Sequence, residues 1–265
     1  MPNAEKIDWK SLEFTCKQEK NPPLDPEADA WYRHARDLQK KDQDKYVGTI
    51  VEYFEKAITR NHYNAMHRLA LLYVEGAEGL KPSEGKAVDL VERVIKLNVA
   101  SGYYQMGVFL EQGIGVKQDR AGSLTYMRKA ADMGSPQAQL VLGKKLLLIS
   151  EQAERAHAVP IGLTMLECAL AQGIGEAGYR IAIHIEDDDS AGALRRHQEA
   201  AKLGYAQSLY SLMTVFREGN RGLAKDEQRA ACYERLWRES EADKTKRFPN
   251  LDIICPLPPR PMPAS

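Results

Sequence analysis

The chain has 265 residues, and its 37 Lys or Arg residues balance 37 Asp or Glu residues, so its formal net charge is zero. This balance offers no global basic field for a nucleic-acid backbone and no acidic block typical of a disordered tail. No apolar run approaches the roughly 18 residues that a membrane helix needs. The first twenty residues also have no hydrophobic stretch followed by a cleavage site. We therefore expect a soluble chain that does not bind nucleic acid and that either stays in the cytoplasm or has lost a leader.

The N-terminal part is predicted as a lead-in followed by a helix pair. Residues 1–24 end near Asn-Pro-Pro and should be extended. Asp25, Pro26 and Glu27 then supply an N-cap, a first-turn proline and a first-turn acid. Apolar residues at helical spacing follow over 28–40 and 47–60. Residues 25–62 are therefore predicted to form N-terminal capping helices.

The middle of the chain, residues 63–240, is predicted as an array of alternating helices. No segment shows convincing period-two alternation, so the predicted fold class is all-α. The expected helices cover about 64–75, 83–97, 101–112, 119–132, 136–150, 158–171, 176–186, 190–202, 205–218 and 224–240.

A small residue opens every second helix of this array. These residues recur 31 to 39 residues apart, a period typical of helical-pair solenoids, and are Ala65, Gly102, Ala138, Ala177 and Ser208. Two helices can approach closely only where a side chain is tiny. Four places later an apolar residue should be buried on the same face, namely Leu69, Met106, Leu142, Ile181 and Leu212. The turn before each should contain a left-handed residue, at Asn61, Asn98, Gly134, Gly173 and Gly204.

One copy of this pattern closely resembles the Sel1-like repeat. Its residues run Gly102-Tyr-Tyr-Gln-Met-Gly-Val-Phe-Leu-Glu-Gln-Gly-Ile-Gly-Val-Lys-Gln-Asp-Arg-Ala121 and continue from Tyr126 to Gly134. The resemblance extends loosely over about residues 50–240 and departs most at 184–190. It implies a right-handed α-solenoid of Sel1-like, TPR-like helix pairs with an extended Pro-rich C-terminal tail at 241–265.

The flanking segments narrow this resemblance. Residues 248–259, together with Cys16 and the segment 24–28, look like a bacterial subgroup similar to immunity proteins encoded beside type VI secretion lipase effectors. The resemblance implies a periplasmic protein, with its leader absent from this chain, that binds a secreted phospholipase or lipase toxin one to one and neutralises it. A cytoplasmic location is the alternative. A general Sel1-repeat scaffold in signalling or envelope assembly is the second function considered.

The third function considered is that of an enzyme, such as a cell-wall or β-lactam hydrolase. Ser83 and Lys86 have the S-x-x-K spacing, but no K-T-G or S-D-N accompanies them. Residues 173–178 match G-x-G-x-x-G, yet a helix rather than a strand precedes them. His184 with residues 186–189 could ligate a cation, although a solvated acidic turn is favoured. We therefore expect no catalysis, no cofactor and no metal.

A protein-binding surface is expected on the concave side of the array. By analogy with tetratricopeptide packing, first-helix positions −1, +2, +6 and +9 from the small residue face that side. The +2 row contains amphipathic rings, which suit an interface. The alternative is that some tyrosines only seal neighbouring repeats. The candidate partner-binding residues are Asn64, His67, Tyr104, Glu111, Lys144, Tyr179, Glu186, Tyr210 and Arg217.

The four cysteines, Cys16, Cys168, Cys232 and Cys255, form no C-x-x-C pair, which argues against a zinc or thioredoxin-like site. Cys168 falls in a helix and is expected to be a buried free thiol. Cys255 lies in the proline-rich segment 253–259 of the tail, which should not be helical and would be loose unless fastened. A disulfide from Cys232 to Cys255 would attach it to the last long helix.

Overall fold

A computed structural model describes residues 8–220 and 222–259. Within these residues the regular secondary structure is helical and contains no β-strand, which confirms the all-α class. The helices are α1 (Pro26–Ile58), α2 (Tyr63–Glu75), α3 (Glu84–Lys96), α4 (Ala100–Gln112), α5 (Arg120–Asp132), α6 (Pro136–Leu147), α7 (Gln152–Ala171), α8 (Gly175–Ile185), α9 (Ser190–Lys202), α10 (Ala206–Glu218), α11 (Glu227–Ala242) and α12 (Leu251–Ile254).

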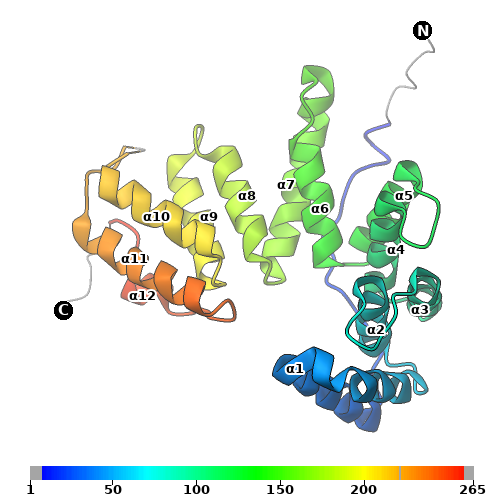
Figure 1. Cartoon of the computed structure of the whole chain (residues 1–265). Helices are drawn as coiled ribbons and strands as arrows, with labels where there is room; N and C mark the ends of the chain where they lie inside the picture. The colour runs from blue at the N-terminus through cyan, green and yellow to red at the C-terminus, as the bar shows by residue number, and fades with distance from the viewer. Residues whose placement is uncertain (1–7, 221, 260–265) are drawn as a thin grey trace. The chain divides into compact units, whose positions relative to one another are not determined.

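The helices are divided between two compact units. Among the described residues, the N-terminal unit runs from Lys17 to Ala138, and the C-terminal unit begins at Gln139 and also includes residues 8–16 of the lead-in. In the first, α2 packs against α3 and α4 against α5 (Figure 1). In the second, α8 packs against α9 and α10 against α11. The repeated helix pairs predicted from the spacing are therefore present in both units.

The small residues that open the first helices are all buried, as the packing argument requires. So are the five apolar residues that follow four positions later, Leu69, Met106, Leu142, Ile181 and Leu212. Gly102 shows how close the helices come, because a β-carbon at this position would lie 2.8 Å from Val94 Cγ1 and 2.9 Å from the Ile95 nitrogen. The repeated pattern is therefore a pattern of helix–helix contact.

The turns between neighbouring pairs adopt the left-handed backbone that the sequence predicted. The φ angle is 58° at Asn61 and 54° at Asn98, and it is also positive at Gly134, Gly173 and Gly204. Gly134 has a second constraint, because a β-carbon there would lie 2.5 Å from the main chain of Gln18 and Glu19 in the lead-in. Only glycine satisfies both conditions at that turn.

Replacing Asn98 by alanine should lower the free energy of unfolding by about 1 kcal/mol, because the left-handed conformation costs an ordinary side chain about that much. Asn98 is exposed, so no packing is lost with its side chain. Replacement by glycine, which adopts this conformation freely, should cost nothing or stabilise slightly. Urea denaturation of the two variants measures the difference, and equal stabilities would contradict the argument.

Helix α1 contains the two capping helices predicted for its sequence. The helix is interrupted at Asp42, whose backbone is extended with φ −174° and ψ 97°. The Asp42 carboxylate accepts a hydrogen bond from the Lys45 backbone nitrogen at 3.1 Å, so it caps the second half. The break divides α1 into two helical halves, and each half has its own apolar stripe in the sequence.

Helix α7 begins earlier than predicted. The expected start near residue 158 places Pro160 in the first turn, but the helix begins at Gln152 and has Pro160 in its interior. Proline removes one intrahelical hydrogen bond. Packing accounts for the longer helix, because Gly162 lies against α6: a β-carbon at Gly162 would be 3.0 Å from the Gly143 carbonyl oxygen. This contact holds the segment helical in spite of the proline.

The C-terminal tail is docked against α9 and α11. Phe248, Leu251 and Cys255 are buried. The Cys255 carbonyl oxygen accepts hydrogen bonds from the Tyr233 hydroxyl at 2.7 Å and from Gln198 Nε2 at 3.0 Å. Residues 253–259 were expected to contain no helix. This is wrong for Ile253 and Ile254, which complete the single turn of α12 before the first proline of the segment. Residues 260–265 of the tail lie outside the described residues.

Both pairs of cysteines form disulfides. Cys232 is bonded to Cys255 with a Cα–Cα distance of 6.1 Å, the pairing that the sequence suggested. Cys168 is bonded to Cys16, with a Cα–Cα distance of 5.5 Å, so its prediction as a free thiol is wrong. The side chain of Cys168 is buried, as expected, but its partner comes from the lead-in, 152 positions away along the chain. Repeat spacing carries no information about such a distant contact.

Candidate partner-binding surface

The nine candidate residues are each half-buried or exposed, in contrast to the buried small and apolar residues between them. They belong to two units. The N-terminal unit holds Asn64, His67, Tyr104 and Glu111, and the C-terminal unit holds Lys144, Tyr179, Glu186, Tyr210 and Arg217. The local surroundings of these side chains divide them further into packing residues and surface residues.

In the N-terminal unit the two rings of the +2 row are largely covered. Burial, together with the neighbouring positive charge of Arg68, lowers the pKa of His67 to about 4, although a hydrogen bond with Gln105 opposes this shift. Burial also raises the pKa of the Tyr104 hydroxyl, and the carboxylate of Glu111 adds to the effect. His67 is therefore neutral at pH 7, and both rings contribute more to packing than to free surface.

The lowered pKa of His67 predicts loss of stability in mild acid. The unfolded chain takes up a proton near pH 6.5 and the folded chain only near pH 4, so stability falls as the pH drops between these values. Between pH 7 and 4.5 the wild type should lose about 2 kcal/mol more than His67→Gln, which does not titrate. Thermal denaturation of both proteins at the two pH values measures this. Parallel losses would contradict the assignment.

Tyr179 packs between neighbouring repeats. Its ring centroid lies 5.7 Å from that of His197 on α9 and 5.5 Å from that of Tyr205, which precedes α10. The Arg180 guanidinium carbon lies 5.7 Å from the centre of the same ring. For this tyrosine the alternative interpretation holds: it seals α8 against the next repeat.

A charged triad lies beside Tyr179. Glu176 Oε1 accepts hydrogen bonds from Lys144 Nζ at 2.7 Å and from Arg180 Nε and Nη2 at 3.1 Å. Burial disfavours the charged form of Glu176, but these hydrogen bonds outweigh it and hold its pKa below the usual value. Two cations therefore share one carboxylate, and Lys144 connects α6 to α8.

The most exposed ring of the +2 row is on α10. Tyr210 is 49% exposed, and its ring centroid lies 5.4 Å from that of Trp237 on α11, in an edge-on arrangement. Arg217 follows Tyr210 by seven positions on α10, and Glu234 precedes Trp237 by three positions on α11. Arg217 Nη2 donates to Glu234 Oε2 at 2.5 Å, and Arg238 Nη2 donates to Glu234 Oε1 at 2.6 Å. Hydrogen bonds from Arg238 and Arg217 lower the pKa of Glu234, so this carboxylate stays ionised. We call these five residues the α10–α11 patch.

Three members of the α10–α11 patch, Glu234, Trp237 and Arg238, were not among the predicted site residues. The predicted residues all come from the first helix of a pair, whereas these three are on a second helix. A signal was nevertheless present: Trp237 is one of only three tryptophans in the chain and stands among charged residues.

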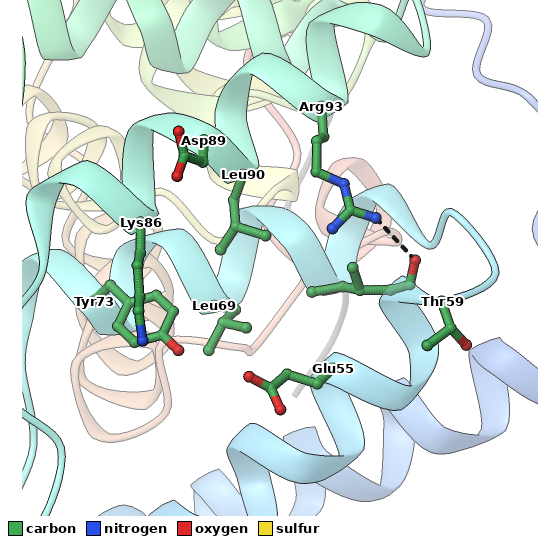
Figure 2. A pocket seen from close by; sticks show the side chains of 9 residues that line it. Glu55, Thr59, Leu69, Tyr73, Lys86, Asp89, Leu90 and Arg93 are labelled. Atoms are coloured by element: carbon green, nitrogen blue, oxygen red, sulfur yellow. Dashed lines mark hydrogen bonds between the residues drawn. The ribbon is translucent and has the colours of Figure 1, made fainter.

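An open cavity of about 360 Å³ lies between α1, α2 and α3 in the N-terminal unit (Figure 2). Lys86, the lysine of the S-x-x-K pattern, places its Nζ 5.0 Å from the centre of the Tyr73 ring on the cavity wall. Arg93 donates to the Ile58 carbonyl oxygen at 3.3 Å. The lining residues are Glu55, Ile58, Thr59, Leu69, Tyr73, Lys86, Asp89, Leu90 and Arg93. In this environment Lys86 packs over an aromatic ring.

The other motifs examined in the sequence lie at helix ends. Gly173, with φ 93°, ends α7, and α8 begins two residues later, so the G-x-G-x-x-G pattern spans a helix–turn–helix. Asp189, the last residue of the acidic turn, accepts a hydrogen bond from the Gly192 nitrogen at 2.8 Å and caps α9. Across residues 8–220 and 222–259 no group of three or more His, Cys, Asp or Glu side chains is placed to hold a metal ion.

The repeated helix pairs, which carry aromatic and charged side chains at their surface, define an α-solenoid repeat protein. A family model for the Sel1 repeat matches residues 64–98 and 100–135. The chain is 36% identical to immunity protein Pa5087 from Pseudomonas aeruginosa. The match covers 94% of this chain and 96% of that one, with a TM-score of 0.72. Immunity protein PA5088 from the same organism is 34% identical, with coverage of 94% and 95% and a TM-score of 0.77. The chain belongs to the Sel1-repeat family that includes these proteins.

A curated relative matches a shorter stretch. Chitin synthase regulatory factor 3 of Schizosaccharomyces pombe is 27% identical over 105 residues, which make up 39% of this chain but only 11% of that protein. In the part of the chain that the structure describes, we find no helix that is both long enough and apolar enough to cross a bilayer.

Proposed function

We propose that this Sel1-repeat chain is an immunity protein that binds a cognate type VI secretion phospholipase or lipase effector one to one and neutralises it. The observation that carries this proposal is the likeness, along 94% of the chain and at 34% to 36% identity, to two solved proteins described as immunity proteins. Neutralisation by binding requires a preformed complementary surface and no chemistry on the part of the inhibitor. The bound chain would occlude the active-site entrance of the lipase or block its approach to the membrane.

The physical character of the fold supports a binding role. Helix pairs packed through buried small residues hold their outer side chains in fixed positions, so little conformational entropy is lost when a partner docks. Tyrosine, tryptophan and arginine, the residues that most often dominate interface energies, lie together on α10 and α11.

We further propose that the chain works in the periplasm. Two disulfides support this location, because such bonds form and persist in oxidising compartments and are rare in the cytoplasm. The lipid substrate of a toxin delivered to the cell envelope would be accessible there.

The direct test is co-expression with a candidate type VI secretion lipase from the same bacterium, with both proteins directed to the periplasm of a bacterial host. The chain should restore growth, and the two purified proteins should form a one-to-one complex by light scattering. A lipase carrying a substituted nucleophile controls for toxicity unrelated to hydrolysis. Continued growth arrest with both proteins folded and present, or no complex, would contradict the proposal.

A second variant separates binding from hydrolysis by the chain itself. Ser83→Ala removes the hydroxyl of the S-x-x-K pattern while leaving the α10–α11 patch untouched. Protection should be unchanged in this variant. Loss of protection together with loss of a measurable hydrolytic turnover would favour the enzyme alternative.

A further inference from the structure

We propose that the α10–α11 patch binds an acidic segment of the partner protein, with an apolar side chain of that segment on Tyr210 and Trp237 and its carboxylates on Arg217 and Arg238. The inference deepens the proposed function and rests on it for the identity of the partner. It concerns one surface within the C-terminal unit and names the chemistry that the surface recognises.

The aromatic part of the patch provides apolar contact area. Tyr210 is half exposed although it packs edge-on against Trp237, so one side of the pair is covered by the protein and the other faces solvent. Tyr103 and Tyr126 form a comparable pair between α4 and α5, with ring centroids 6.2 Å apart, but both of those rings are half-buried. Exposure of large amphipathic rings next to arginine is typical of interface hot spots.

The charged part of the patch carries an excess of positive charge. Arg217 and Arg238 share the single carboxylate of Glu234, so the triad has a net charge of +1. The Arg238 side chain is 72% exposed and that of Arg217 is 45% exposed, whereas Glu234 is only 26% exposed. Each guanidinium has five N–H donors, so both retain donors directed to solvent after binding Glu234. An incoming carboxylate can accept these in a bidentate arrangement.

The charges that surround the triad are engaged locally. Arg235 and Lys246 pair with Glu239 at 2.9 Å and 3.6 Å, and Lys244 pairs with Glu241 at 2.7 Å. At the end of α10 the Glu218 carboxylate accepts a hydrogen bond from the uncharged Asn220 amide at 3.3 Å. In the same unit, Lys144 and Arg180 share Glu176 in the same two-to-one ratio. Two small groups in the C-terminal unit, on helices α6, α8, α10 and α11, therefore each place two cations on one carboxylate.

This distribution favours an acidic protein segment over a nucleic acid. A nucleic acid presents phosphates along its whole length and requires a continuous basic stripe. Here the chain as a whole is neutral, and each triad adds a single positive charge. A short segment in which Asp or Glu flanks an apolar residue matches the pair of rings in the patch and the exposed N–H donors of its two guanidinium groups.

Trp237 provides the readout. In the variant Trp9→Phe/Trp31→Phe it is the only tryptophan, and its fluorescence reports the patch directly. The probe is the peptide acetyl-Glu-Asp-Phe-Asp-Glu-amide, and the control peptide replaces each acid by its amide. The acidic peptide should change the fluorescence saturably and bind at least about tenfold more tightly than the control peptide, a difference of about 1.4 kcal/mol. Raising the salt concentration should weaken the binding of the acidic peptide.

Charge reversal tests the assignment of the arginines. Arg217→Glu/Arg238→Glu in the same background should abolish the response to the acidic peptide. The matched control, Arg33→Glu/Lys40→Glu, reverses two exposed cations that pair with carboxylates on α1, and it should leave the response intact. Equal responses to both peptides, no response to the acidic one, or tighter binding of oligothymidylate than of the acidic peptide would overturn the inference.

The two proposals fail separately. If co-expression shows no protection but the acidic peptide binds through Arg217 and Arg238, the surface inference stands and the lipase assignment falls. If protection is complete and remains complete in Arg217→Glu/Arg238→Glu, with no response to the acidic peptide, the immunity function stands and the α10–α11 patch is not its binding surface.

Discussion

Replacing Tyr210 and Trp237 together by alanine is expected to weaken binding of the lipase partner by about 100-fold or more, or about 3 kcal/mol. The half-exposed Tyr210 ring and the half-buried Trp237 ring form the apolar part of the α10–α11 patch and pack against each other, so truncating both removes contact area that the neighbouring arginines cannot replace. Isothermal titration calorimetry with the purified partner measures the loss. The free protein should remain helical by circular dichroism.

The matched control is Tyr103→Ala/Tyr126→Ala, which removes an aromatic pair between α4 and α5. Its affinity for the partner should stay within about threefold of the wild type. Tyr179→Ala should instead lower the melting temperature, because that ring packs between α8, α9 and Tyr205. An unchanged affinity of the Tyr210/Trp237 variant would show that the partner binds elsewhere.

Removing the Cys16–Cys168 disulfide is expected to lower the free energy of unfolding by about 3 to 5 kcal/mol. The bond joins residues separated by 152 positions, so it removes a large amount of conformational entropy from the unfolded chain. Cys16→Ser is the variant of choice, since Cys16 is exposed and Cys168 is buried. Urea denaturation measures the change.

Cys232→Ser gives the internal comparison. Its disulfide spans only 23 positions, for which the same chain-entropy relation gives about 3 kcal/mol. Cys16→Ser should therefore be the more destabilising change, and a reducing agent should lower the stability of the wild type without further affecting a variant that lacks all four cysteines. A larger effect of Cys232→Ser would contradict the entropic argument and would point to the docked tail as the main source of stability.

Much of the fold could be predicted from the sequence, because the signals involved are local. Ala65 and Leu69 share a helix face by their spacing alone, and the structure buries both. Asn98 and Gly134 mark turns because few residues tolerate a positive φ, and both have one. The break in α1 at Asp42 likewise follows from two separate apolar stripes. Pro160 misled the prediction because packing of Gly162 against Gly143 outweighed a local preference.

The candidate site could be predicted only in part. The repeat phase predicted Tyr210 and Arg217 on the concave side, and both side chains are exposed. It gave no means of separating them from Tyr179, which occupies the same repeat position but packs against Tyr205, or from His67, which is largely covered. The three patch residues on α11 were missed because their position depends on how α11 lies against α10.

The sequence by itself determined the helix-pair repeat and its turns, since these depend on backbone preferences and on contacts between residues a few positions apart. The Sel1-like class came from the resemblance of residues 102–134 to that family's motif. Only the tertiary structure decided that Cys16 bonds to Cys168, that the tail docks through the Cys255 carbonyl, and that Trp237 and Arg238 join Tyr210 and Arg217 in one surface. Contacts between distant residues depend on the packing of whole helices. A periodic pattern predicts which side of a helix is buried. It does not predict which distant side chains meet on the exposed side.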